Sequence, residues 1–350
     1  MKVLVLGAGV IGVTCAYYLK RAGHEVVVVD RQSGPAMETS FANAGGLCPG
    51  FAGPWAAPGI PGKLARWMLA RHAPLSFRLQ PDSRQWRWLA AFLRNCSPER
   101  FGHNKARMQR IAHYSKACLA SLRDETGIAY DQQSRGVLQI FRTDAECALA
   151  SHSSKVLESF GVRHAIVDAE TAKTIEPALK RSMVSIAGGL HLPDDETGDC
   201  HLFTARLADL LRKQGVAFRF GMTIRGLSAE GGRITGVVTT QGILAADHYV
   251  VALGSEAPLL LHALGIDIPI YPVKGYSITL PIDDDDCAPR SSVMDEHTKV
   301  MITRLGSRLR AAGVAEIGGY HRDTDSRRAS GVRAAAARTP DTRRGSVSWS

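Results

Sequence analysis

The 350-residue chain is 45% apolar and 22% charged, which is the composition of a soluble globular protein with more residues than one hydrophobic core usually holds. No stretch approaches eighteen uninterrupted apolar residues, so the sequence predicts no membrane-spanning helix, and the glycines in its first apolar run argue against a signal peptide. Seven scattered cysteines without a CxxC pair argue against disulfides and metal sites, so we expect no metal and a reducing cytoplasm. The net charge is +10, but six arginines and one aspartate in 326–350 supply half of it.

The first thirty residues have the pattern of a dinucleotide-binding unit. A strand over 2–6 runs into the glycine-rich turn 7–12, a helical pattern follows over 13–21, and a second strand over 24–30 ends in an acid. The order strand, glycine-rich turn, helix, strand, acid is that of a Rossmann fingerprint. An ordinary βαβ unit without a ligand is the alternative, and the unit alone does not distinguish NAD from FAD.

Each special residue of this unit has a physical role. Gly7 allows the tight turn out of the strand, Gly9 lets the backbone approach a pyrophosphate, and Gly12 lets the helix pack closely. The helix N-terminus offers unpaired N–H groups to phosphates. Asp30 can accept hydrogen bonds from a ribose.

A small, polar loop over 39–46 follows the second strand. Loops at the carboxyl ends of strands carry the ligand in open α/β sheets, so Ser40 and Asn43 are candidates to contact a phosphate or ribose. A plain surface loop is the alternative.

From 51 to 118 the composition shifts toward proline, tryptophan and basic residues. Leu64, Trp67, Met68 and Arg71 have helical spacing. We expect this stripe to be the packed face of a second domain, with a helix lying on a membrane surface as the alternative.

The rest of the chain alternates helices and strands. Asp199 is the expected N-cap of a helix, because the acids over 194–199 fit no calcium-loop spacing. After 325 the apolar periodicity vanishes, so the tail 326–350 is expected to be disordered. We expect helices over 108–126, 145–160, 169–175 and 202–213, and strands over 130–141, 216–220, 233–239, 242–246, 248–254, 299–303 and 308–313.

With these segments assembled, the sequence resembles the FAD-dependent D-amino-acid oxidase superfamily, and within it the bacterial D-amino-acid dehydrogenase family of the small-subunit type. The resemblance covers roughly Met1 to Asp325 and is specific, because many motifs occur in order. They are 3–17, 39–45, 54–59, 71–75, 192–200, 272–277 and 295–304.

The resemblance implies an α/β fold: a Rossmann-like FAD-binding domain, with the GxGxxG βαβ unit and a β-meander, and an inserted α+β substrate domain. The FAD-binding domain is expected at 1–50 and 185–265, and the substrate domain at 51–184 and 266–325. The cofactor residues implied are Val3, Leu4, Val5, Leu6, Gly7, Ala8, Gly9, Val10, Ile11, Gly12, Val13, Thr14, Cys15, Ala16, Tyr17, Asp30, Arg31, Ser40, Asn43 and Ala44.

The implied reaction is oxidative deamination of D-amino acids, D-alanine among them, to 2-oxo acids and ammonia, with hydride transfer to flavin N5. Electrons then pass to a respiratory acceptor. The expected location is the cytoplasm, with peripheral attachment to the inner face of the cell membrane as an alternative, and no nucleic acid is expected as a partner. Lys274 and Tyr276 are the substrate-side candidates, with ordinary strand residues as the alternative.

The sequence departs from the family in its last part. A G-L-R-P motif, whose arginine holds the substrate carboxylate, and a G-H-G motif near the flavin are both absent. The arginine-rich tail in their place resembles a shifted reading frame, which suggests a truncated C-terminus. The alternatives are a catalytically inert relative that retains only nucleotide binding, and an NAD-linked dehydrogenase.

Overall fold

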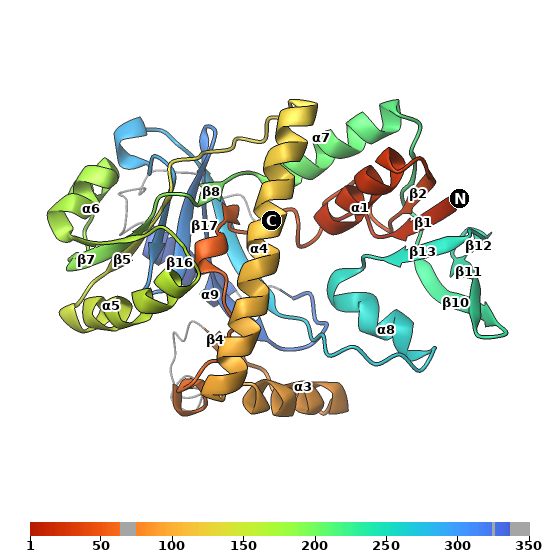
Figure 1. Ribbon diagram of the computed structural model, residues 1–350, viewed down its shortest axis with the longest axis horizontal. Coiled ribbons are helices and arrows are strands. Elements are labelled where there is room, and N and C mark those ends of the chain that lie inside the picture. The colour runs from red at the N-terminus through yellow and green to blue at the C-terminus, as the bar shows by residue number, and fades with distance from the viewer. Residues whose placement is uncertain (64–74, 324–325, 337–350) are drawn as a thin grey trace. The chain divides into compact units, whose positions relative to one another are not determined.

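The computed structural model describes residues 1–63, 75–323 and 326–336 (Figure 1). The chain divides into two compact units. The first unit consists of 1–43 and 199–272, and the second of 44–198 and 273–350. The predicted boundaries differ in three places: 266–272 had been expected in the second unit, and 44–50 and 185–198 in the first. In the structure the segment 185–198 contains a strand that pairs within the sheet of the second unit.

The first unit is built on a parallel sheet with the order β13-β1-β2-β9. Its strands alternate with helices α1 and α7, as the sequence predicts for a βαβ unit, and α1 packs against α7 (Figure 1). The elements are β1 Lys2–Leu6, α1 Val10–Arg21, β2 Glu25–Val29, α7 Cys200–Lys213, β9 Ala217–Arg219 and β13 His248–Val251.

A three-stranded antiparallel meander covers this sheet. Met222 and Val237 from the meander region are buried against Leu4, Leu6 and Val29 of the parallel strands. The hairpin predicted around Gln241 is confirmed, and the chain then continues into two short helical segments. The elements are β10 Ile224–Glu230, β11 Arg233–Thr239, β12 Gly242–Leu244, η3 Gly254–Glu256 and α8 Ala257–His262.

The second unit is built on a long mixed sheet with the order β14-β17-β16-β15-β5-β7-β6, and β4 pairs with β17. The strands are β4 Leu75–Phe77, β5 Val137–Phe141, β6 Ala165–Asp168, β7 Gly188–Leu192, β14 Lys274–Pro281, β15 Ser292–Asp295, β16 Val300–Leu305 and β17 Arg308–Ile317. A small second ladder joins β3 Gly46–Leu47 to β8 Glu196–Thr197.

Helices cover both faces of this sheet (Figure 1). Successive strand residues point to opposite faces, so Leu138 packs under α6 whereas Leu192, on the other face, packs under α5. The helical segments of the second unit are η1 Pro49–Phe51, α3 Ser83–Arg94, α4 Pro98–Thr126, α5 Asp144–Ser159, α6 Ala169–Ile175, η2 Pro177–Arg181 and η4 Asp285–Cys287.

Three predicted elements of the second unit have different bounds or lie outside the described residues. The strand predicted over 130–141 begins only at Val137, because Asp131 and Gly136 adopt positive φ angles of 55° and 78° that interrupt an extended chain. Helix α4 begins at Pro98, ten residues before the predicted start, and ends where predicted, at a left-handed Gly127. The helical stripe predicted at Leu64, Trp67, Met68 and Arg71 lies outside the described residues.

The predicted disorder of 326–350 is wrong for its first part. Ser326–Ala336 forms helix α9, which packs on β14, β16 and β17. Ala329, Val332 and Ala335 are buried in the same cluster as Tyr276. Three small apolar residues spaced three apart make a narrow face that a search for long apolar runs overlooks. Residues 337–350 lie outside the described part of the chain.

The acidic stretch 194–199 ends at the N-cap of helix α7, as predicted. The Asp199 carboxylate accepts a hydrogen bond from the Leu202 N–H at 3.0 Å, which is the expected N-cap. Within the described ranges, the His, Cys, Asp and Glu side chains form no group that could hold a metal ion.

Asp195, in the same stretch, makes the stability of the protein depend on pH. Its side chain is buried, and burial raises its pKa to about 6. The folded protein therefore holds this proton more tightly than the unfolded chain, so the ionised carboxylate destabilises the fold above pH 6, and this effect disappears toward pH 4. We expect Asp195→Asn to raise the free energy of unfolding at pH 7.5 by about 2 kcal/mol.

Urea unfolding of the wild type and Asp195→Asn at pH 4, 5, 6 and 7.5 measures this difference. We expect the gain to shrink steadily as the pH falls. A difference that is the same at all four pH values would contradict the interpretation, because it would reflect packing and not titration.

Candidate dinucleotide-binding site

The glycine-rich turn leaves space that no other residue type would leave. Gly7 has a φ of +105°, and a Cβ there would lie 2.5 Å from the Ala252 carbonyl oxygen. A Cβ on Gly12 would lie 1.8 Å from the Gly7 carbonyl oxygen. A Cβ on Gly9 would meet only the Ser40 hydroxyl, at 3.3 Å, so the backbone at Gly9 is open to a ligand. The tight turn at Gly7 and the close packing at Gly12 are as predicted, and the approach of Gly9 to a pyrophosphate stays a prediction.

Two predicted site residues, Asp30 and Ser40, form hydrogen bonds with backbone N–H groups in and beside the glycine-rich turn. The Ala8 N–H donates to Asp30 Oδ2 at 2.6 Å, and the Gln32 N–H donates to Asp30 Oδ1 at 2.8 Å. The Val10 N–H, at the start of α1, donates to Ser40 Oγ at 3.0 Å. Carboxylate and hydroxyl oxygens accept more than one hydrogen bond, so both side chains can still receive one from a ligand.

Ser40 and Asn43 gather near the start of α7 as well. Both side chains form hydrogen bonds with the Cys200 thiol, and burial, the larger influence, raises the pKa of that thiol. Arg31, which follows β2, forms ion pairs with Glu38 and Glu256, each at 2.5 Å. The arginine thereby ties the end of β2 to η3.

The remaining predicted cofactor residues divide into two groups. The β1 residues Val3–Leu6 and three of the α1 residues are buried, so they form the packed core that supports the glycine-rich turn. The buried α1 residues predicted to contact the cofactor, apart from Gly12, are Val13, Ala16 and Tyr17. Ile11 is exposed, Cys15 is half-buried, and Thr14 Oγ1 donates to the Val10 carbonyl. Ala44 lies in the second unit, where its carbonyl accepts from Thr303 Oγ1 at 2.8 Å.

The two substrate-side candidates lie on β14 of the second unit and already have partners. Lys274 Nζ donates to the Asp323 carbonyl at 2.7 Å. Tyr276 is buried, and its hydroxyl donates to Glu316 Oε2 at 2.8 Å. Glu316 also forms an ion pair with Arg328 of α9, with 3.1 Å between Nε and Oε2. Sequence reasoning missed Glu316 and Arg328, although the pairing of β14 with β17 brings Glu316 directly opposite Lys274.

A parallel sheet with a glycine-rich turn, an acid at the tip of β2 and a meander defines a Rossmann-type dinucleotide-binding protein. The chain belongs to the DAO family of FAD dependent oxidoreductases, whose model matches residues 2–350. FAD is the cofactor of this family. The site fits a dinucleotide, because the backbone at Gly9 is open and the turn around it is fixed by hydrogen bonds to Asp30 and Ser40.

The chain is similar to curated proteins named D-amino acid dehydrogenase. It is 54% identical to that of Rhodopseudomonas palustris over 91% of this chain and 75% of the relative. It is 53% identical to that of Granulibacter bethesdensis over 91% of this chain and 77% of the relative. The predicted family is therefore confirmed.

Solved structures with low sequence identity have the same fold. Glycine oxidase from Geobacillus kaustophilus superposes with a TM-score of 0.72 over 99% of this chain and 80% of that one, at 19% identity. Glycine oxidase from Bacillus cereus has a TM-score of 0.69 over 96% of this chain and 77% of that one, at 21% identity. The predicted α/β fold with a Rossmann-like FAD-binding domain is confirmed.

None of the helices in the described ranges is both long enough and apolar enough to cross a membrane.

Proposed function

We propose that the protein oxidises D-amino acids, with D-alanine among its substrates, to 2-oxo acids and ammonia. The observation that carries the proposal is the 54% identity, over 91% of the chain, to a protein named D-amino acid dehydrogenase. The glycine-rich turn also supports the proposal, because the backbone at Gly9 is open to a ligand and the N-terminus of α1 follows directly, which suits a pyrophosphate.

The reaction needs little acid–base chemistry from the protein. Bound FAD supplies the two-electron acceptor for the α-hydride of the substrate. The neutral substrate amine becomes a protonated imine as that hydride leaves, and water then hydrolyses this imine to the 2-oxo acid and ammonium. The task of the chain's own residues is to orient the substrate and to hold its carboxylate.

Lys274 is the proposed cation for the substrate carboxylate. Its ammonium group has three N–H donors, and only one is needed for the Asp323 carbonyl. Tyr276 is the second proposed residue. Its hydroxyl donates to Glu316, so its oxygen can only accept a further hydrogen bond, for which the substrate amine is a possible donor.

We expect Lys274→Met to raise the KM for D-alanine at least tenfold, because a charge-assisted hydrogen bond to the carboxylate is lost. Steady-state kinetics with an artificial electron acceptor measures KM and kcat separately. Lys180→Met, at an exposed position on η2, is the matched control and should leave KM unchanged. An unchanged KM in Lys274→Met would remove Lys274 from the proposed site.

The reaction itself is tested by adding D-alanine to the purified yellow protein under anaerobic conditions. We expect the flavin absorbance near 450 nm to bleach at about one equivalent of substrate, whereas L-alanine should leave it unchanged. Protein that retains FAD but is not reduced by any D-amino acid would instead indicate an inert relative.

We further propose that electrons leave to a respiratory acceptor and that the protein works in the cytoplasm or on the inner face of the cell membrane. The relatives named dehydrogenases support an acceptor other than oxygen. Reoxidation of the reduced protein by a soluble quinone should be faster than by dissolved oxygen. Sedimentation with anionic and neutral vesicles tests attachment to a membrane surface.

A further inference from the structure

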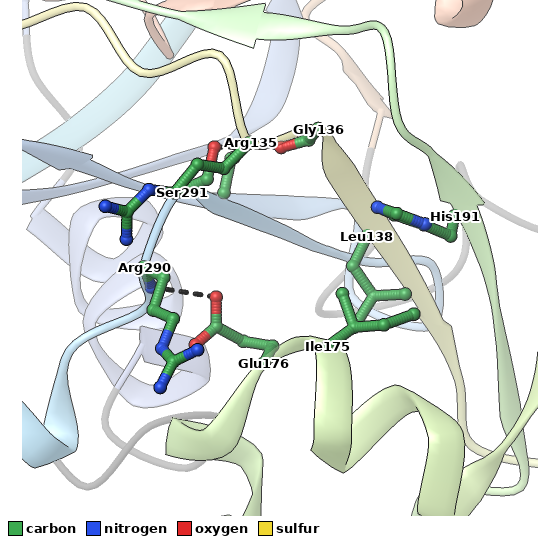
Figure 2. A pocket seen from close by; sticks show the side chains of 9 residues that line it. Arg135, Gly136, Leu138, Ile175, Glu176, His191, Arg290 and Ser291 are labelled. Carbon is green, nitrogen blue, oxygen red and sulfur yellow. Dashed lines mark hydrogen bonds between the residues drawn. The ribbon is translucent and has the colours of Figure 1, made fainter.

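A cavity of about 390 Å³ lies in the second unit, where β5, β7 and the segment before β15 meet the end of α6. Its size is at the lower end of the range for small-molecule pockets. Figure 2 shows the Arg135 and Arg290 guanidinium groups on one side of the cavity with the Glu176 carboxyl beside them. Leu138 and Ile175 form an apolar wall. A second hollow of about 400 Å³ shares Arg135, Glu176 and Arg290 with the first.

The Glu176 carboxyl is incompletely paired. The residue is 3% exposed, and its Oε2 accepts a hydrogen bond from the backbone N–H of Arg290 at 2.8 Å. Oε1 is buried and has no hydrogen-bond partner. Burial raises the pKa of Glu176, which reflects the energetic penalty of a carboxylate in this position. A buried, unpaired polar atom at the wall of a cavity is relieved when a ligand supplies the missing donor.

The two arginines are available to a ligand. Neither Arg135 nor Arg290 forms an ion pair with another side chain in the described ranges. By contrast, Arg304 in the neighbouring hollow is paired with Asp285. Across the cavity, His191 Nε2 is buried without a partner, and burial lowers the pKa of His191, so the ring is neutral. The wall therefore presents two positive groups next to one carboxyl.

The cavity lies on the opposite face of the second unit's sheet from the segment 44–46, which contains the predicted cofactor residue Ala44. Leu138 pairs directly with His191 and Val293, and Val293 pairs with Ile302, so these side chains share one face. The segment 44–46 contacts Met301 and Thr303, whose side chains point to the other face. The β14 candidates Lys274 and Tyr276 are also separated from β5 by β17, β16 and β15. The cavity is thus distinct from the proposed substrate residues.

We propose that this cavity is a second ligand site that binds the zwitterion of an apolar α-amino acid. An α-amino acid carries its carboxylate and ammonium on one carbon, which matches the arginines and Glu176 lying side by side. The carboxylate pairs with Arg135 and Arg290, and the ammonium donates to Glu176 Oε1. The apolar side chain lies against Leu138 and Ile175. The protein therefore binds an amino acid in this cavity without oxidising it.

Isothermal titration of the FAD-bound full-length protein with L-leucine tests the site. We expect saturable binding of one L-leucine per chain without a change in flavin absorbance. 4-Methylpentanoate lacks the ammonium and 3-methylbutylamine lacks the carboxylate, so each should bind at least tenfold more weakly. Equal affinity for 4-methylpentanoate, or no saturable binding of leucine, would overturn the proposal.

Variants locate the binding. Glu176→Gln keeps an oxygen for the Arg290 N–H but loses the charge, and we expect it to bind leucine at least tenfold more weakly. Arg135→Gln, at an exposed position before β5, gives the same test if Glu176→Gln does not fold. Arg233→Gln, on an exposed arginine of β11, is the matched control and should bind as the wild type does.

These variants also separate the second site from the proposed reaction. Bleaching of the flavin by D-alanine should proceed in Glu176→Gln and Arg135→Gln as in the wild type. Leucine binding that survives both substitutions would place the ligand elsewhere and overturn the proposal, whether or not the protein oxidises D-alanine.

Discussion

Replacing Gly12 with alanine should leave a purified protein with less than a tenth of the wild-type FAD content. A Cβ on residue 12 would lie 1.8 Å from the Gly7 carbonyl oxygen, and that atom belongs to the backbone of the turn. Helix α1 must therefore move away from the turn, so its N-terminal N–H groups no longer point toward the pyrophosphate. A cost of about 3 kcal/mol, at the upper end for overpacking, corresponds to roughly hundredfold weaker binding.

The ratio of flavin to protein absorbance, together with a titration of the apoprotein with FAD, measures this effect. Gly34→Ala is the matched control in the same unit, because a Cβ there meets nothing within 4 Å and its φ is not positive. It should bind FAD as the wild type does. If Gly12→Ala binds FAD as tightly as the wild type does, the glycine-rich turn is not the FAD-binding site.

Replacing Asp295 with alanine should lower the free energy of unfolding by about 3–5 kcal/mol. Asp295 is fully buried at the end of β15 and forms an ion pair with Arg142. Its Oδ1 also accepts from the His297 N–H at 3.0 Å, which shapes the turn into β16. Removal of the carboxylate leaves a largely buried guanidinium without its partner, and such a loss is far more costly than the loss of a surface pair.

Asp194→Ala provides the comparison, since Asp194 and Arg163 form an ion pair with both side chains more than half exposed. Its cost should stay within about 1 kcal/mol. Urea unfolding of both variants at one pH gives the two values. Equal costs would contradict the assignment of Asp295–Arg142 as a buried, stabilising pair.

Local patterns were sufficient to predict the first unit. The turn 7–12, Asp30 and the N-cap Asp199 lie in or beside the elements they serve, so spacing along the chain reveals their roles. The domain that these elements build could therefore be predicted from local patterns, whereas the choice of FAD over NAD required the family resemblance.

Contacts between distant residues could not be predicted in the same way. Glu176 meets Arg290 more than a hundred residues later, and Arg142 meets Asp295 across the β5–β15 pair. Tyr276 was identified as a candidate, but its partner Glu316 is fixed by the register of β14 and β17, which no local pattern encodes. Helix α9 was missed because its buried face consists of alanine and valine and not of large apolar residues.

Helix α9 has a practical consequence for the design of shortened variants. Its Ala329, Val332 and Ala335 cover Ile278 and other buried side chains of the second unit's sheet. A variant ending at 325 would expose that apolar surface to solvent and should aggregate during expression. Shortened variants should therefore end no earlier than 336, so that Ala329, Val332 and Ala335 continue to cover this surface.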